Sequence, residues 1–181
     1  MKTIQLNSEV MVSDPCYSVP TWCQHKLTNV LPGEYVTNVF KSDEGVWGTR
    51  IGILVAVHKD YSQDDLSWRA VSGAVIGVDS GQCGIFSMET YRKDEVFMEK
   101  SNFSFGDSSE GDHWYGHMCD RTLCDNKWGT YSHGAVSSSG YGDGSYRLCV
   151  AKHKGKIVGI GIDYLGYKNG AFNLVAQNEL V

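Results

Sequence analysis

Short runs of β-branched and aromatic residues, separated by glycine-containing turns, constrain the fold of this chain more than any other feature. Glycine accounts for 21 of the 181 residues, about 12% against the roughly 7% that is usual. With only 3 prolines, the sequence has neither the repeat of collagen nor the composition of a low-complexity linker. Because these glycines lie among Val, Ile, Tyr and Trp, they indicate short strands joined by tight turns.

Several segments have the length and composition of strands. Residues 50–58 form an apolar run typical of a central strand covered on both faces, and residues 68–78 are similar. Residues 147–151 and 156–164 flank a Lys-His-Lys-Gly-Lys turn, which predicts a hairpin. Residues 166–175 predict one further strand pair around an Asn-Gly turn. About eight to ten strands favour a mainly β fold, an antiparallel β-sandwich or a barrel-like sheet.

Two segments depart from the strand pattern. Residues 17–29 have only a weak apolar face and predict a helix or an irregular loop. Residues 87–132 predict a small helical or irregular insertion, with short helices over 88–99 and 111–123 and Asp112 as the N-cap of the second. We expect this insertion to belong to a single mainly β domain spanning residues 1–181, since that length suits one domain with its own core.

The charge balance excludes some classes of partner. With 16 Lys+Arg against 21 Asp+Glu, the formal net charge is −5, which argues against non-specific nucleic-acid binding. The basic residues at 152–156 are interpreted as a solvated hairpin turn. There is no stretch of about 20 apolar residues for a membrane span, and the N-terminus lacks the apolar stretch of a signal peptide. We therefore expect a cytoplasmic protein whose six cysteines are reduced thiols.

Acidic residues at three turns form one candidate site. Asp14 precedes a proline, Asp79 begins an Asp-Ser-Gly turn, and Asp143 lies between two glycines of the segment 137–146. If the three carboxylates converge, they would suit a divalent metal or a cationic ligand. Alternatively, each accepts hydrogen bonds from its own turn. The alternating glycines of 137–146 either present backbone N–H groups to a ligand or bend a strand.

A second candidate is a possible zinc site. His113, His117, Cys119 and Cys124 have side chains suited to zinc, but their spacing matches no standard structural motif. Packing of Cys119 with solvated histidines is the alternative. Nothing pairs a cysteine or serine with a histidine for nucleophilic catalysis, so no catalytic residue is assigned. The five tryptophans are able to stack on a ligand, but packing explains most of them.

The order of the glycine turns carries a family resemblance. The segments concerned are Asp14-Pro15, Pro32-Gly33-Glu34-Tyr35-Val36, Val78-Asp79-Ser80-Gly81, Ser139-Gly140-Tyr141-Gly142-Asp143-Gly144-Ser145-Tyr146 and Gly155-Lys156-Ile157-Val158. Together they resemble an uncharacterised bacterial and phage domain family with a Ser-Gly-x-Gly-Asp-Gly-x-Tyr segment before a C-terminal hairpin. The segments at Cys16, Trp22-Cys23 and Trp114-Tyr115 resemble a phage-associated subset. The resemblance implies kinship of fold and a phage origin, and it supplies no activity, cofactor or catalytic set.

These patterns favour a binding protein over an enzyme. The expected partner is a small polar ligand or a host protein, in the host cytoplasm if the chain is phage-encoded; a homo-oligomer is also compatible with the sequence. One alternative is a metal-dependent hydrolase that uses the aspartates or the His/Cys group around a divalent ion. A second alternative is a structural or assembly protein. The predicted ligand-binding residues are Asp14, Asp79, Tyr141, Gly142, Asp143 and Ser145.

Overall fold

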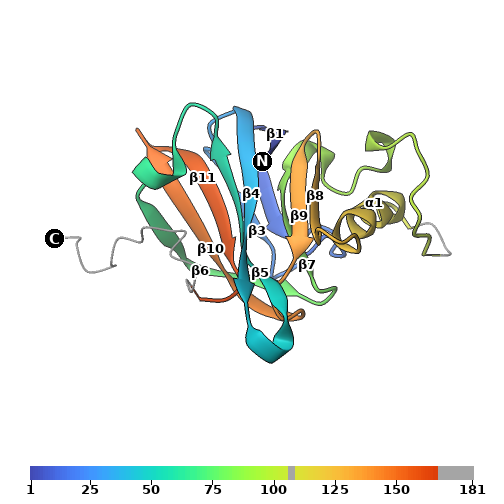
Figure 1. The fold of residues 1–181 in the computed structure, drawn as a ribbon. Helices are drawn as coiled ribbons and strands as arrows, with labels where there is room; N and C mark the ends of the chain where they lie inside the picture. Colours follow the sequence, from blue (N-terminus) through green and yellow to red (C-terminus); the bar gives the residue numbers. More distant parts are fainter. Residues whose placement is uncertain (106–108, 167–181) are drawn as a thin grey trace.

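Two antiparallel sheets pack face to face in the computed structural model, which describes residues 1–105 and 109–166 (Figure 1). In strand order, sheet A contains β1 (Lys2–Leu6), β4 (Gly33–Asp43), β5 (Thr49–His58), β11 (Lys156–Asp163), β10 (Gly144–His153) and β6 (Trp68–Val78). Sheet B contains β3 (His25–Leu27), β2 (Val10–Ser13), β7 (Gln82–Ser87), β9 (Gly134–Ser138) and β8 (Trp128–Tyr131). The predicted mainly β, sandwich-like fold is confirmed.

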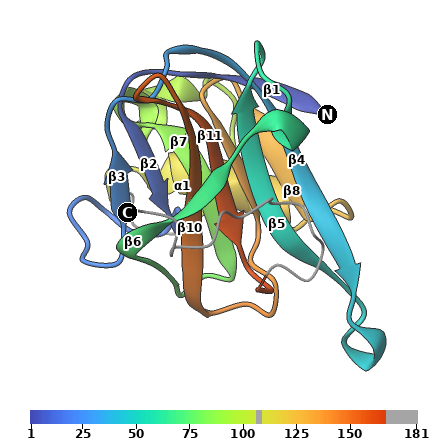
Figure 2. The same ribbon diagram turned by 90° about the vertical axis from the view of Figure 1, so that its left-hand side faces the viewer.

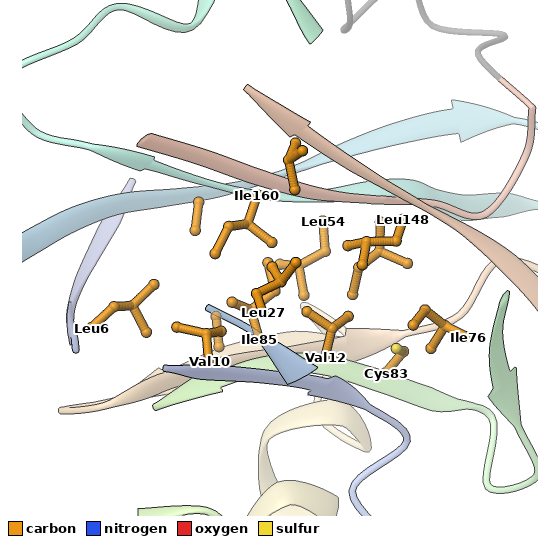
Figure 3. Close-up of a cluster of buried hydrophobic side chains, with 14 of the residues drawn as sticks. Leu6, Val10, Val12, Leu27, Leu54, Ile76, Cys83, Ile85, Leu148 and Ile160 are labelled. Atoms are coloured by element: carbon orange, nitrogen blue, oxygen red, sulfur yellow. The ribbon is translucent and has the colours of Figure 1, made fainter. Parts of the chain in front are cut away.

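The main core fills the space between the sheets (Figure 3). Side chains alternate along each strand, so Val10 and Val12 of β2 both point inward toward sheet A. The run 50–58 is covered on both faces, as predicted. Leu54 belongs to the inner core, whereas its neighbours Ile53 and Val55 pack in a second cluster with Trp68.

The two sheets are also joined along both edges. The backbone N–H of Gln5 in β1 donates to the carbonyl of Ser132, next to β8, at 2.7 Å. At the opposite edge, the N–H of Gly77 in β6 donates to the carbonyl of Cys23 at 3.0 Å. These bonds give the sandwich a barrel-like closure and bring the 14–24 loop against the end of β6.

The predicted insertion contains one α-helix. Helix α1 (Asp112–Thr122) matches the expectation for 111–123, and it covers the outer face of sheet B (Figure 1). Residues 88–99 do not form the expected helix but two short 3-10 turns, η3 (Met88–Thr90) and η4 (Asp94–Val96). The end of the predicted insertion supplies β8 to sheet B. An aromatic cluster packs beneath the helix and comprises Phe86, Tyr91, Trp114 and Tyr131.

The predicted N-cap of α1 is wrong. Gly111 occupies the cap position, and Asp112 is the first helical residue. Asp94 from η4 caps the helix, because its carboxylate accepts the N–H of Trp114 at 2.8 Å and that of Gly111 at 2.9 Å. The helix therefore begins on a carboxylate that lies 17 residues before Gly111 in the chain.

Two smaller expectations concern the last part of the chain. The hairpin predicted around residues 152–156 is confirmed, and Lys154 and Gly155 adopt the left-handed conformations of its turn. The strand pair predicted for 166–175 lies, apart from Gly166, outside the described residues. Within the described ranges, no helix is long and apolar enough to cross a bilayer.

Candidate functional site at the end of the sandwich

The glycine-containing turns that sequence analysis singled out meet at one end of the sandwich. Figure 2 shows the β6–β7 and β9–β10 turns side by side at its lower end. The N–H of Ser139 donates to the carbonyl of Gly81 at 3.0 Å, which joins these two turns. The end of β2, at Asp14, is bonded to the same place through the carboxylate of that residue.

Asp14 is fully buried and cross-links two segments far apart in the sequence. Oδ1 accepts the N–H of Cys16 at 2.8 Å and the hydroxyl of Ser80 at 2.7 Å. Oδ2 accepts the N–H groups of Asp79 at 2.8 Å and Ser80 at 2.7 Å. With four donors around it, this carboxylate fixes the turns and is not presented to a ligand.

A chain of polar contacts continues from this cross-link to helix α1. Burial raises the pKa of the Tyr115 hydroxyl, which lies near Ser80 and Cys119. The amide of Gln82 donates to the sulfur of Cys119 at 3.5 Å, and the hydroxyl of Thr122 donates to Gln82 at 2.8 Å. The turn that contains Asp79 is thereby set at a fixed position relative to α1.

The candidate zinc residues do not share one centre. His113 and His117 lie near each other on α1, with ring centroids 4.8 Å apart, but each Nε2 contacts a backbone carbonyl, of Phe97 at 3.0 Å and of Glu99 at 2.9 Å. Cys119 belongs to the polar chain above. Cys124 is exposed, and its thiol donates to the carbonyl of Arg121. Across the described residues, no group of three or more His, Cys, Asp or Glu side chains is placed to bind a metal ion.

The thiol beside Asp14 is held in its neutral form. Burial, followed by the hydrogen bond to Asp14 and the charge of that carboxylate, raises the pKa of Cys16 from 9.0 to about 12. Burial also raises the pKa of Cys83 well above its ordinary value. Since the thiolate is the nucleophilic form, neither residue has the environment of a reactive cysteine at neutral pH. All six cysteines are free thiols.

The glycine-rich segment 139–146 closes on itself. The hydroxyl of Tyr146 lies 2.9 Å from the carbonyl of Ser139 and 2.6 Å from that of Gly142, and the hydroxyl of Ser139 donates to Gly142 at 2.8 Å. Gly140 and Gly142 have φ values of +51° and +108°, which disfavour other residues. The carbonyl of Gly142 therefore serves this loop rather than a ligand.

Tyr141, another predicted binding residue, contacts the tip of the β4–β5 hairpin. Its hydroxyl donates to Glu44, its ring meets that of Trp47 edge-on at 6.4 Å, and the guanidinium of Arg50 lies 5.9 Å from the ring centroid. Figure 2 shows this hairpin projecting from the end of sheet A. Tyr141 thus packs against the hairpin tip and is not among the residues that line the neighbouring pocket.

Asp79 and Ser145 line a pocket of about 290 Å³ between the 17–23 loop and the ends of β6 and β10. Ser145 is the register partner of Gly77, and exposed Asp143 lies two residues before it in the chain. Of the six predicted ligand-binding residues, Asp79 and Ser145 alone line the pocket. Its lining comprises Tyr17, Thr21, Trp22, Cys23, Gly77, Val78, Asp79, Gly144 and Ser145.

One wall of the pocket was missed by sequence analysis. Tyr17, Thr21 and Trp22 come from a loop without strand or helix periodicity. Burial, and then hydrogen bonds to Asp79 and Cys23, raise the pKa of Tyr17, so its hydroxyl stays protonated. The signal in the sequence was Trp22 within an unpatterned segment, a position where it is 88% exposed rather than packed.

Comparisons of the chain with protein-family models, with curated proteins and with solved structures gave no match.

Proposed function

We propose that this chain is a non-enzymatic binding protein and that the pocket at the end of the sandwich is its binding site. The observation that carries the proposal is the composition of the pocket lining. Aromatic rings from Tyr17 and Trp22 lie beside the polar groups of Asp79 and Ser145. A binding pocket characteristically combines apolar or aromatic surface with a few convergent polar groups.

The walls of this pocket are fixed before any ligand arrives. The carboxylate of Asp14 accepts hydrogen bonds from Cys16, which directly precedes the 17–23 loop, and from Asp79. It thereby joins this loop to the turn that contains Asp79. The bond from the N–H of Gly77 to Cys23 joins the same loop to β6. Such pre-organisation lowers the entropic cost of binding, because fewer groups must be ordered when the ligand enters.

The same contacts favour binding over catalysis. Asp14 is saturated with donors, and Cys16 is a neutral thiol at physiological pH. The alternative of a metal-dependent hydrolase would require Asp14 to exchange its hydrogen bonds for metal coordination. Elemental analysis of protein purified without chelator tests this alternative, which a stoichiometric divalent ion would support. The assembly-protein alternative is tested by light scattering, which would then show a defined oligomer.

The glycine-turn resemblance adds a proposal about the family of this chain and the compartment in which it acts. In this proposal the chain is a divergent relative of the bacterial and phage domain family, and it acts in the host cytoplasm. Within the Ser139–Tyr146 segment, Ser139, Gly142 and Tyr146 bond to one another and close the loop. A protein of the host is then the alternative to a small ligand as the occupant of the pocket.

Titration of ¹⁵N-labelled protein with chemically distinct probes tests the binding site. Suitable probes are choline, glucose, inorganic phosphate and adenosine. We expect at least one to shift the amide resonances of residues 17–23, 77–79 and 144–145 in a saturable way. Trp22→Ala should weaken that response, whereas Trp47→Ala, at an exposed tryptophan of the hairpin tip, should not. Absence of any saturable response at these amides would overturn the proposal.

A further inference from the structure

The pocket carries negative charge and no compensating positive charge in its lining. Asp79 is the single charged residue among the lining residues, and its side chain is exposed. Asp143 adds a second exposed carboxylate one residue before Gly144, which is the register partner of Val78. An anionic group placed here would be repelled at close range, whereas a cation would be attracted.

The aromatic residues lie beside this charge. Tyr17 lines the pocket together with Asp79, and the pKa of its hydroxyl is raised by burial and then by the nearby carboxylate. Trp22 lines the same pocket and presents most of its surface to solvent. Aromatic rings attract organic cations through the negative potential of their faces, and Trp and Tyr do so best. A carboxylate with adjacent aromatic rings is therefore suited to an alkylammonium or guanidinium group.

Buried residues give the pocket lining an apolar part, which suits an alkyl stem. Cys23 and Val78 are buried there, and Gly77 packs so closely that an added Cβ would lie 2.7 Å from the Cβ of Cys23. Thr21 and Ser145, which also line the pocket, supply hydroxyl groups, which accept hydrogen bonds from N–H donors.

We propose that the pocket recognises an organic cation, an alkylammonium or guanidinium group carried on a short apolar stem. This inference rests on the proposed binding function and narrows it to one ligand chemistry. Such a group occurs both in free small amines and in the lysine and arginine side chains of proteins.

A pair of nearly isosteric probes tests the charge requirement. Choline and 3,3-dimethyl-1-butanol have similar shapes, but only choline carries a positive charge. We expect choline to shift the amides of the pocket with at least fivefold higher affinity, a preference that weakens as salt is raised. Equal binding of the two would overturn the inference and leave the binding function in place. If phosphate or glucose shifts these amides in a saturable way and choline does not, the cation inference is likewise overturned and the binding function stays in place. If no probe binds, both proposals fail.

Matched variants assign the recognition to named side chains. Asp79→Asn should weaken choline binding about fivefold, and Trp22→Ala about two- to fivefold. Asp125→Asn and Trp47→Ala alter exposed residues outside the pocket lining and should leave the affinity unchanged. An Asp79→Asn variant that binds choline as tightly as the parent chain would contradict the inference.

The source of the cation is distinguished by a third comparison. Spermidine and n-butylammonium represent free amines, and the capped peptide Gly-Gly-Lys-Gly-Gly represents a protein side chain. Tighter binding of the free amines supports a small-molecule ligand, and tighter binding of the peptide supports a protein partner. Both results support recognition of a cation, whereas failure of all three probes, alongside failure of choline, opposes it.

Discussion

The side chain of Asp14 holds together two turns at this end of the molecule. Its local bond to the N–H of Cys16 is the turn-type contact that sequence analysis gave as one alternative. Its three other bonds go to Asp79 and Ser80, 65 and 66 residues away. A local pattern predicts the first kind of contact and contains no information about the second.

Replacement of Asp14 should be among the most damaging single changes in the chain. Asp14→Ala leaves three N–H groups and a hydroxyl without their acceptor, two of the N–H groups on the Asp79–Ser80 turn. We expect the free energy of unfolding to fall by about 3–5 kcal/mol, measured by urea denaturation.

Two further variants separate this effect from a general change of charge. Asp14→Asn keeps one oxygen acceptor and should lose less stability than Asp14→Ala. Asp125→Ala removes an exposed aspartate after α1 and should change stability by less than about 0.5 kcal/mol. An Asp14→Ala variant as stable as Asp125→Ala would contradict the structural role assigned to Asp14.

The raised pKa of Cys16 predicts a pH dependence of stability. The folded protein retains the thiol proton up to about pH 12, while the unfolded chain releases it near 9.0. The contribution of this group is therefore complete below pH 9 and is lost as the pH rises toward 12. In urea denaturation across pH 8–11, the parent chain should lose more stability than Cys16→Ser. Parallel profiles for the two proteins would refute this assignment.

At the scale of elements, periodic segments were predicted well and irregular ones poorly. The strand at 50–58 was identified because a continuous apolar run of that length requires cover on both faces. The residues expected as a helix over 88–99 form 3-10 turns, and Asp94 among them bonds to the start of α1. Capping by a distant residue leaves no mark in the sequence next to the helix.

Asp94 supplies a prediction for α1. Asp94→Ala removes the acceptor of the Trp114 and Gly111 N–H groups. We expect a loss of about 1 kcal/mol in stability and faster hydrogen exchange at the first amides of α1, measured by NMR. Glu95→Ala, at the exposed neighbouring residue, is the control, and equal exchange in the two variants would be inconsistent with a capping role for Asp94.

At the scale of the whole molecule, sequence analysis found the turns that meet but only part of the pocket between them. Asp79 and Ser145 were identified because acidic and glycine-rich turns are visible as local patterns. Tyr17 and Trp22 were missed because their loop has no periodicity, and it is placed by a long-range bond between Gly77 and Cys23. Contacts between segments distant in the sequence decide which of several turns form a site.

Closure of the sandwich beside the pocket requires glycine at position 77, because Cys23 packs directly against it. Gly77→Ala would place a Cβ 2.7 Å from that of Cys23 and 2.9 Å from its sulfur. We expect a loss of about 1–3 kcal/mol in unfolding free energy and altered amide resonances at Cys23. Ser72→Ala changes an exposed position of the same strand and should alter neither; unchanged resonances in Gly77→Ala would argue against close contact at this edge.

The order of strands in sheet A has a consequence for synthesis of the protein. β5 pairs on one side with β11, and among the strands of residues 1–105 and 109–166 the partner of β6 is β10. Both partners lie about 70 to 110 residues later in the chain. As the chain leaves the ribosome, the apolar strand β5 has one unpaired edge until β11 has been made. Partly synthesised chains with such edges associate readily, so expression of this protein should benefit from chaperones that shield nascent strands.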